Sequence, residues 1–197
     1  PKLEGTAHVN MALIVKFMKN YLFAPADYPE IPLREDLADD TFLFHQGPTK
    51  GLGKIRFHDY KATYDQFELP NVDVFKKQIK GLKKLLVVAK PDEAQARDLD
   101  YLLALGELFT LVVYGHLVLE KALMDETDSD LVNQMFGLFV RDFSGYATEL
   151  LGKPSNSGRQ QKLIQELIRA PVADQEQFDK VWTEHVFALK GRYRMKD

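Results

Sequence analysis

The sequence contains no cysteine, which excludes disulfide bonds, thiol nucleophiles and cysteine-ligated zinc. This composition is compatible with a reducing cytosol, so we expect a cytoplasmic protein. Neither sign of charge dominates, because 26 lysines and arginines face 29 aspartates and glutamates and the net charge is −3. We therefore expect no nucleic-acid partner, since nucleic-acid recognition needs a basic surface.

The sequence also lacks an uninterrupted apolar run long enough to cross a membrane. Its most apolar region, residues 99–124, is interrupted by Asp100, Glu107, His116 and Glu120. This pattern predicts a buried core helix and no membrane span. The hydrophobic content of 45% is ample for such a core.

Motifs for metal and nucleotide binding are missing as well. The histidines show no spacing typical of metal ligands on a helix, so we expect no metal site. His116 and His185 are expected to be satisfied core or interface residues. Residues 47–54 end in Gly-Lys, but their spacing differs from that of a phosphate-binding loop, and Ile55 replaces the magnesium-binding Ser or Thr. A glycine-rich surface turn is the better interpretation.

Apolar residues recur every three or four positions through most of the chain, which is typical of amphipathic helices. Ser157 with Gln160, and Asp174 with Gln177, provide capping signals for the last two helices. We expect Phe178, Val181, Trp182, His185 and Leu189 to form the buried face of the final helix. Because the turns are short, the pattern predicts an all-α, up-down helical bundle. The expected helices are residues 6–23, 72–89, 93–124, 130–151, 159–169 and 175–189.

Residues 25–70 interrupt this pattern with five prolines and a cluster of acidic residues. We expect a long irregular arm or linker there, with short extended pieces at 42–44 and 55–57 and a short helix within 58–67. Structureless segments of this length are uncommon inside a compact domain. The arm is therefore expected to lie along upstream domains or a partner subunit.

Within the first ten residues, a carboxylate is followed by residues that favour a turn and a helix start. Glu4 is followed by Gly5, which allows close backbone approach, and by Thr6, a preferred helix N-cap, before the apolar periodicity begins. A helix start offers free N–H groups and a partial positive charge to a bound ligand. Without further information, Glu4 would be an acid that stabilises the helix dipole.

Residues 3–16, Leu-Glu-Gly-Thr-Ala-His-Val-Asn-Met-Ala-Leu-Ile-Val-Lys, resemble the Glu-Gly-Thr segment of acyl-CoA dehydrogenases, which opens a long helix. The largely helical continuation, including residues 47–60, resembles the C-terminal extension of larger bacterial members of that family. The resemblance implies a bundle similar to the C-terminal part of those enzymes, and a flavoprotein oxidoreductase of fatty acid β-oxidation.

The resemblance also implies roles for individual residues. In that family the glutamate is the catalytic base, so Glu4 would remove the α-proton of a fatty acyl-CoA while the β-hydride leaves for FAD. The product would be the trans-2-enoyl-CoA, and an electron-transfer acceptor would reoxidise the flavin. Gly5 would lie against the substrate, and Thr6 and His8 would lie near the FAD.

On this interpretation, residues 1–24 end the catalytic domain, 25–70 form the arm and 71–197 form the helical extension. The chain starts at Pro1, and we expect it to be an excised piece whose upstream domains bind most of the FAD and acyl-CoA. Alone it would then be inactive. Large apolar helix faces further suggest a homo-oligomer.

Two other functions are compatible with the sequence. The chain could be a non-catalytic helical interaction or oligomerisation domain in which Glu-Gly-Thr occurs by chance. Alternatively, five lysines on one side of a helix could meet anionic lipid or the phosphates of CoA, although such faces are usually only solvated. These lysines are Lys76, Lys77, Lys80, Lys83 and Lys84.

Overall fold

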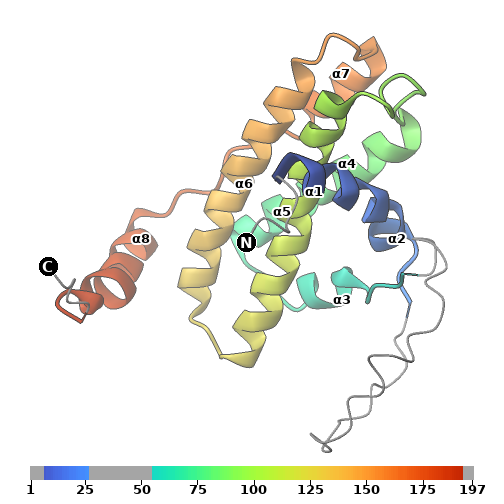
Figure 1. Ribbon diagram of the computed structural model, residues 1–197. Helices are drawn as coiled ribbons and strands as arrows, with labels where there is room; N and C mark the ends of the chain where they lie inside the picture. Colours follow the sequence, from blue (N-terminus) through green and yellow to red (C-terminus); the bar gives the residue numbers. More distant parts are fainter. Residues whose placement is uncertain (1–6, 27–54, 193–197) are drawn as a thin grey trace, which may run out of the picture.

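The computed structural model describes residues 7–26 and 55–192, and every regular element within these ranges is helical (Figure 1). The first helical segment consists of α1 (Ala7–Ile14), the 3-10 turn η1 (Val15–Phe17) and α2 (Met18–Phe23). The other elements are α3 (Tyr60–Tyr64), α4 (Pro70–Val88), α5 (Leu99–Met124), α6 (Ser129–Leu151), α7 (Gly158–Gln165), α8 (Gln175–Val181), the π-helical turn η4 (Trp182–Val186) and the 3-10 turn η5 (Phe187–Leu189).

The central pair, α5 and α6, runs antiparallel and is joined by the short turn at 125–128 (Figure 1). Helix α4 packs on α6 and α7, while α1 and α3 pack on α5. Helix α8 contacts α6 and projects from the body at the C-terminal end. The predicted all-helical bundle is confirmed.

Side-chain caps determine where several of these helices begin. The expected helix at 93–124 begins instead at Leu99, because the Asp98 side chain accepts hydrogen bonds from the N–H groups of Asp100 and Tyr101. The preceding turn is held by Gln95, whose side chain bonds Asp92 and the Ser155 carbonyl. The start predicted six residues earlier is therefore wrong.

The cap predicted for α7 is confirmed. Ser157 accepts a hydrogen bond from the Gln160 N–H, and the Gln160 side chain accepts one from the Ser157 N–H, which completes a capping box. Asp174 likewise accepts from the Gln177 N–H at the start of α8. Both caps satisfy backbone N–H donors that the first helical turn leaves free.

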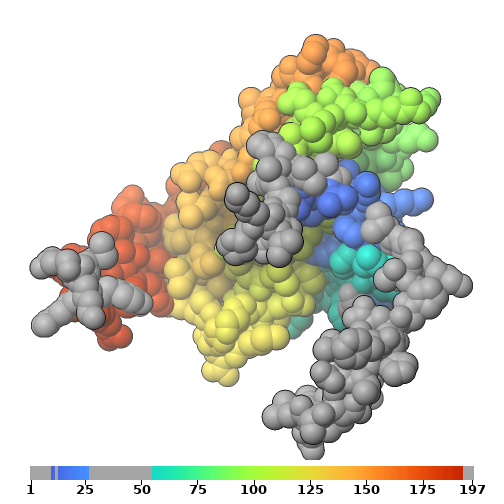
Figure 2. All heavy atoms as spheres, in the orientation of Figure 1, coloured from blue at the N-terminus to red at the C-terminus, as the bar shows by residue number. Residues whose placement is uncertain are grey.

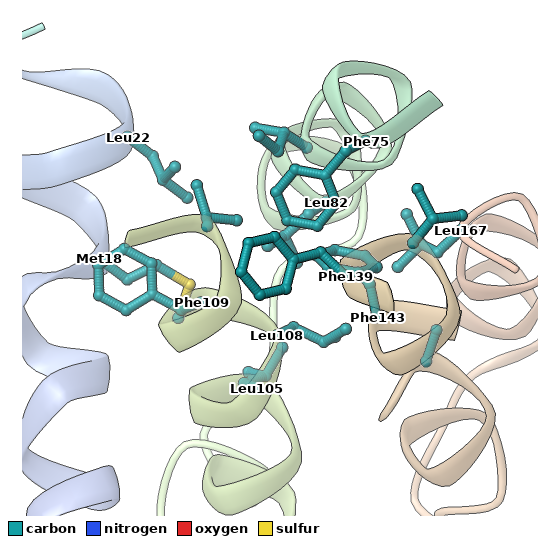
Figure 3. Packing of buried hydrophobic residues seen from close by; sticks show 14 of the residues in the cluster. Met18, Leu22, Phe75, Leu82, Leu105, Leu108, Phe109, Phe139, Phe143 and Leu167 are labelled. Atoms are coloured by element: carbon teal, nitrogen blue, oxygen red, sulfur yellow. The ribbon is translucent and has the colours of Figure 1, made fainter. Parts of the chain in front are cut away.

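One hydrophobic core joins the described parts of all three predicted segments. Figure 3 shows Met18 and Leu22 of α2 facing Phe109 of α5, with α4 and α6 contributing on the other side. Tyr60 and Tyr64 of α3 are also buried in this core. The C-terminal end of the predicted arm thus packs into the chain's own body. Residues 27–54 lie outside the described residues.

Helix α5 occupies the centre of this core. Among the described helices it alone has the length and hydropathy to cross a membrane, and half of its most apolar stretch is buried inside the fold. Gly106 allows α1 to approach it closely, because a Cβ there would lie 2.5 Å from Cγ of Met11 and 3.2 Å from the Met11 carbonyl oxygen. The missing side chain therefore sets the spacing between α1 and α5.

Candidate functional site

The residues predicted to meet substrate and cofactor fall at the edge of the described chain. Glu4, Gly5 and Thr6 lie outside the described residues, and His8 is described only as backbone within α1. The helix predicted for residues 6–23 is present from Ala7, the first described residue, to Phe23, with a 3-10 turn at Val15–Phe17. In the sequence, Glu4-Gly5-Thr6 directly precedes this described helical segment.

An apolar pocket lies beside this helical segment. It has a volume of about 590 Å³, within the range of small-molecule sites. It lies between the α1–α2 segment, residues 57–58 and one side of α5. Most of its wall is apolar or aromatic, contributed by Ile14, Phe17, Phe57, Phe109, Val113 and Leu117.

A buried network of polar side chains forms one side of this pocket. Nδ1 of His116 lies 2.8 Å from the Tyr21 hydroxyl, and Nε2 lies 3.2 Å from both the Thr63 hydroxyl and Oε1 of Glu120. Nε2 is hydrogen-bonded to the Thr63 hydroxyl and Nδ1 to the Tyr21 hydroxyl, while the Glu120 carboxylate acts on the ring through its charge. Through the His116 imidazole, this network joins α2, α3 and α5.

Burial keeps these groups in their neutral forms. Desolvation lowers the pKa of His116 below its usual value, and the nearby Glu120 carboxylate only partly opposes this effect. Desolvation also raises the pKa of Tyr21 well above its usual range and that of Tyr60 to about 12. Because both ring nitrogens of His116 are engaged, the ring is a fixed polar anchor. The expectation that it is a satisfied core residue is confirmed.

A smaller pocket of about 280 Å³ lies where α3 meets α4. Lys61, Lys76, Lys80 and Lys83 border it, and burial together with neighbouring Lys61 lowers the pKa of Lys83. Lys83 also lies over the rings of Phe23 and Tyr60. This part of the predicted lysine face therefore packs against aromatic side chains.

Two other lysines of that face bind groups of the same chain. Lys76 pairs with Asp73 at 2.8 Å and donates to the Phe67 carbonyl at 2.9 Å. Lys84 pairs with Glu166 at 2.8 Å. These contacts connect α4 to its neighbours, so the face is only partly available to an external anion.

Asp128, Glu184 and His185 form the one described group of side chains with metal-ligand character. Their potential ligand atoms lie within 4.8 Å of one another. Asp128, however, already caps α6 through the Asp130 N–H at 2.7 Å and lies 3.7 Å from Nζ of Lys180. The first of these contacts is the largest cause of the lowered pKa of Asp128. We assign the group to fastening α8 onto α6.

Comparison with known proteins identifies no family for the chain. No family model matches it, and no curated protein or solved structure matches it either.

Proposed function

We propose that the chain is the C-terminal part of a cytoplasmic, FAD-dependent acyl-CoA dehydrogenase that converts a fatty acyl-CoA to its trans-2-enoyl-CoA. The observation that carries this proposal is the position of the Glu4-Gly5-Thr6 segment directly before a helix that begins at Ala7. This is the arrangement in which the similar segment of the family opens its helix. The upstream domains and an electron-transfer acceptor complete the system.

Glu4 is the base of the proposed reaction. A free glutamate has a pKa near 4.3, which makes it a weak base toward a carbon acid. Burial of an acyl chain beside its carboxylate expels water and raises that pKa. The backbone N–H of Glu4 stabilises the enolate oxygen of the thioester as the α-proton leaves. Gly5 leaves room for the substrate to approach the backbone.

The helical body supports this role by holding α1 in place. Helix α1 packs on α5 across Gly106, and the buried Tyr21–His116 hydrogen bond fixes α2 behind it. A base must be held within contact of the carbon from which it takes the proton. The extension thus serves as a rigid support for the segment that carries the base.

The described apolar pocket suits an alkyl or aromatic group better than FAD. No lysine or arginine is among the described residues that line it, and Glu120 is the one carboxylate there. That lining does not fit the pyrophosphate of FAD. In our proposal FAD, which accepts the β-hydride when bound, is held by the upstream domains together with Thr6 and His8.

The test uses the polypeptide that carries this chain together with its upstream domains. Glu4→Gln should keep the yellow flavin bound, while dehydrogenation of acyl-CoA falls at least about 10²-fold, as expected for loss of a general base. Glu93→Gln, at an exposed glutamate, is the matched control and should leave turnover unchanged. Near-normal turnover of the Glu4→Gln protein would refute the assignment.

A second candidate function is a non-catalytic helical interaction domain. The observation that favours it is the group of exposed apolar side chains on α8 and the turns after it. This candidate predicts a colourless full-length protein without flavin absorbance. A yellow protein whose absorbance bleaches on addition of acyl-CoA excludes it as the sole function.

A further inference from the structure

The C-terminal helix exposes apolar side chains that were expected to be buried. Phe178, Trp182 and Leu189 are 48%, 51% and 43% exposed, and Val186 and Phe187 are 47% and 55% exposed. Phe178, Trp182, Val186 and Leu189 recur at intervals of three or four residues across α8, η4 and η5, so they share one side. Phe187 is the neighbour of Val186 in the chain, and we call these five residues the aromatic face. Figure 2 shows the C-terminal region, in red, projecting from one side of the body.

Polar contacts hold α8 to the body. The Gln177 side chain donates to Asp130 at 2.8 Å and accepts from the Asn133 side chain at 2.6 Å. Lys180 pairs with Asp130, and the His185 ring lies 3.4 Å from Asp128.

Apolar burial contributes little to this attachment. Only Val181 among the described side chains of α8 is buried. A surface helix ordinarily turns its apolar side to the core. Polar contacts attach this helix to the body, and its apolar side is exposed.

The aromatic face is comparable in area to the largest apolar patch of a typical monomer, and such patches often serve as binding sites. Fully burying one Phe or Trp side chain covers about 150–250 Å². Three half-exposed aromatic side chains, together with the smaller Val186 and Leu189, therefore present on the order of 500 Å². Two such faces in contact would bury about 1,000 Å², the lower limit for a specific interface.

The charges around the aromatic face suit a second copy in antiparallel orientation. Acidic Glu176 and Asp179 lie on α8, where basic Lys180 is already paired with Asp130 of the same chain. Basic Lys190 and Arg192 follow η5, and Glu184 lies between the two ends. The five residues of the face carry no charge. Antiparallel pairing places the acidic end of each helix beside the basic end of the other, whereas parallel pairing opposes like charges.

We propose that the aromatic face pairs with the same face of a second copy of this chain, antiparallel and about a two-fold axis. Such a contact is isologous, so one self-complementary surface serves both partners. The proposal goes beyond the dehydrogenase function and does not depend on it.

Trp182 is the one tryptophan in the sequence, so its fluorescence reports on this contact. Sedimentation of the 197-residue chain should show a monomer–dimer equilibrium between about 1 and 100 μM, the range expected for an interface of marginal size. Trp182 emission should shift to the blue as the dimer forms. Phe178→Glu should give a monomer with red-shifted emission at every concentration.

The matched control is Leu138→Glu on α6, since Leu138 is 51% exposed and lies outside the aromatic face. This variant should dimerise like the parent chain. Equal loss of dimer in both variants would contradict the proposal, and so would a parent chain that stays monomeric. Circular dichroism verifies that each variant is folded. A monomeric chain that binds lipid vesicles through Trp182 would show that the partner is a membrane.

Charge reversal tests the antiparallel orientation. The double variants Glu176→Lys with Asp179→Lys, and Lys190→Glu with Arg192→Glu, each place like charges together and should weaken the homodimer at low salt by about tenfold or more. Mixing the two double variants should restore dimers, since each basic end then meets an acidic one. If the mixture stays monomeric, the antiparallel arrangement is wrong.

Discussion

The Tyr21 hydroxyl lies 2.8 Å from Nδ1 of His116, a residue 95 positions further along the chain. The two side chains belong to α2 and α5, and both are buried. Their hydrogen bond joins the helix after the Glu-Gly-Thr segment to the central helix of the bundle. The N-terminal helices and the bundle therefore share one core.

The first prediction concerns the pH dependence of stability. The folded pKa of His116 is lowered by burial, so acidification protonates this residue in the unfolded chain first, near pH 6.5. Below that pH the unfolded state binds more protons, and the free energy of unfolding decreases until the folded pKa is also passed. Above pH 6.5 the contribution is fully present. Urea unfolding between pH 5 and 8 measures the effect.

The control for this prediction is His116→Gln, which keeps a donor and an acceptor in the same place but does not titrate. Its unfolding free energy should be lower at pH 8 and should change less between pH 6.5 and 5 than that of the parent chain. An unchanged slope would assign the effect to another group.

The second prediction compares two glycines within helices. At Gly115 a Cβ would lie 2.5 Å from the Tyr64 hydroxyl, which is buried and donates to the Val112 carbonyl. Gly115→Ala should therefore destabilise the chain by about 1–3 kcal/mol. At Gly145 no atom lies within 4 Å of the added Cβ.

Gly145→Ala should stabilise the fold by about 0.5–1 kcal/mol, because alanine favours the helix interior. Urea denaturation of both variants provides the measurement. Changes of the same sign would contradict the packing described around Tyr64.

The third prediction concerns Asn71, a buried residue near the start of α4. Its side chain donates to the carbonyls of Asn133 and Val172 at 3.2 Å and accepts from the Val172 N–H at 2.7 Å. Asn71→Ala leaves the buried Asn133 carbonyl and the part-buried Val172 groups without their partner and should cost about 1–3 kcal/mol. It should also speed hydrogen exchange at the Val172 amide, which precedes α8.

The variant Asn71→Asp separates the loss of stability from the faster hydrogen exchange at the Val172 amide. An aspartate retains the acceptor for the Val172 N–H, so that amide should stay protected, while the loss of the donor and the burial of a charge still destabilise the chain. Fast exchange at Val172 in both variants would show that another contact holds this segment.

The sequence alone predicted most helices, because apolar periodicity and capping residues are local signals. Ser157 and Gln160 form the expected capping box. The start of α5 was missed because Asp98 is one of several acids in that region, and its selection as the cap depends on Gln95 binding the distant Ser155 carbonyl. Long-range contacts of this kind leave no local pattern.

The buried face predicted for the last helix is correct for Val181 but wrong for Phe178, Trp182 and Leu189, for a related reason. Periodicity shows that Phe178, Trp182 and Leu189 share a side of the helix, but it does not show what covers that side. The polar side contacts α6 because Gln177 and Lys180 find partners on Asp130. Those partners are set by tertiary structure.

The candidate pocket was not predicted either. Its residues come from separate segments that meet only in the fold, and Tyr21 and Phe57 carry no motif of their own. His116 was singled out as a core residue, and its buried hydrogen bonds confirm that interpretation. The role proposed for Glu4 comes from the resemblance of its short segment to a family motif, and it stays a prediction because Glu4 lies outside the described residues.

Gly106 has a consequence for the proposed reaction, because Met11 of α1 occupies the space that a side chain there would fill. One added methyl group at position 106 would therefore push α1 away from α5. In the proposed dehydrogenase, a single atom on a helix with no part in the chemistry would thus displace the helix that follows Glu4.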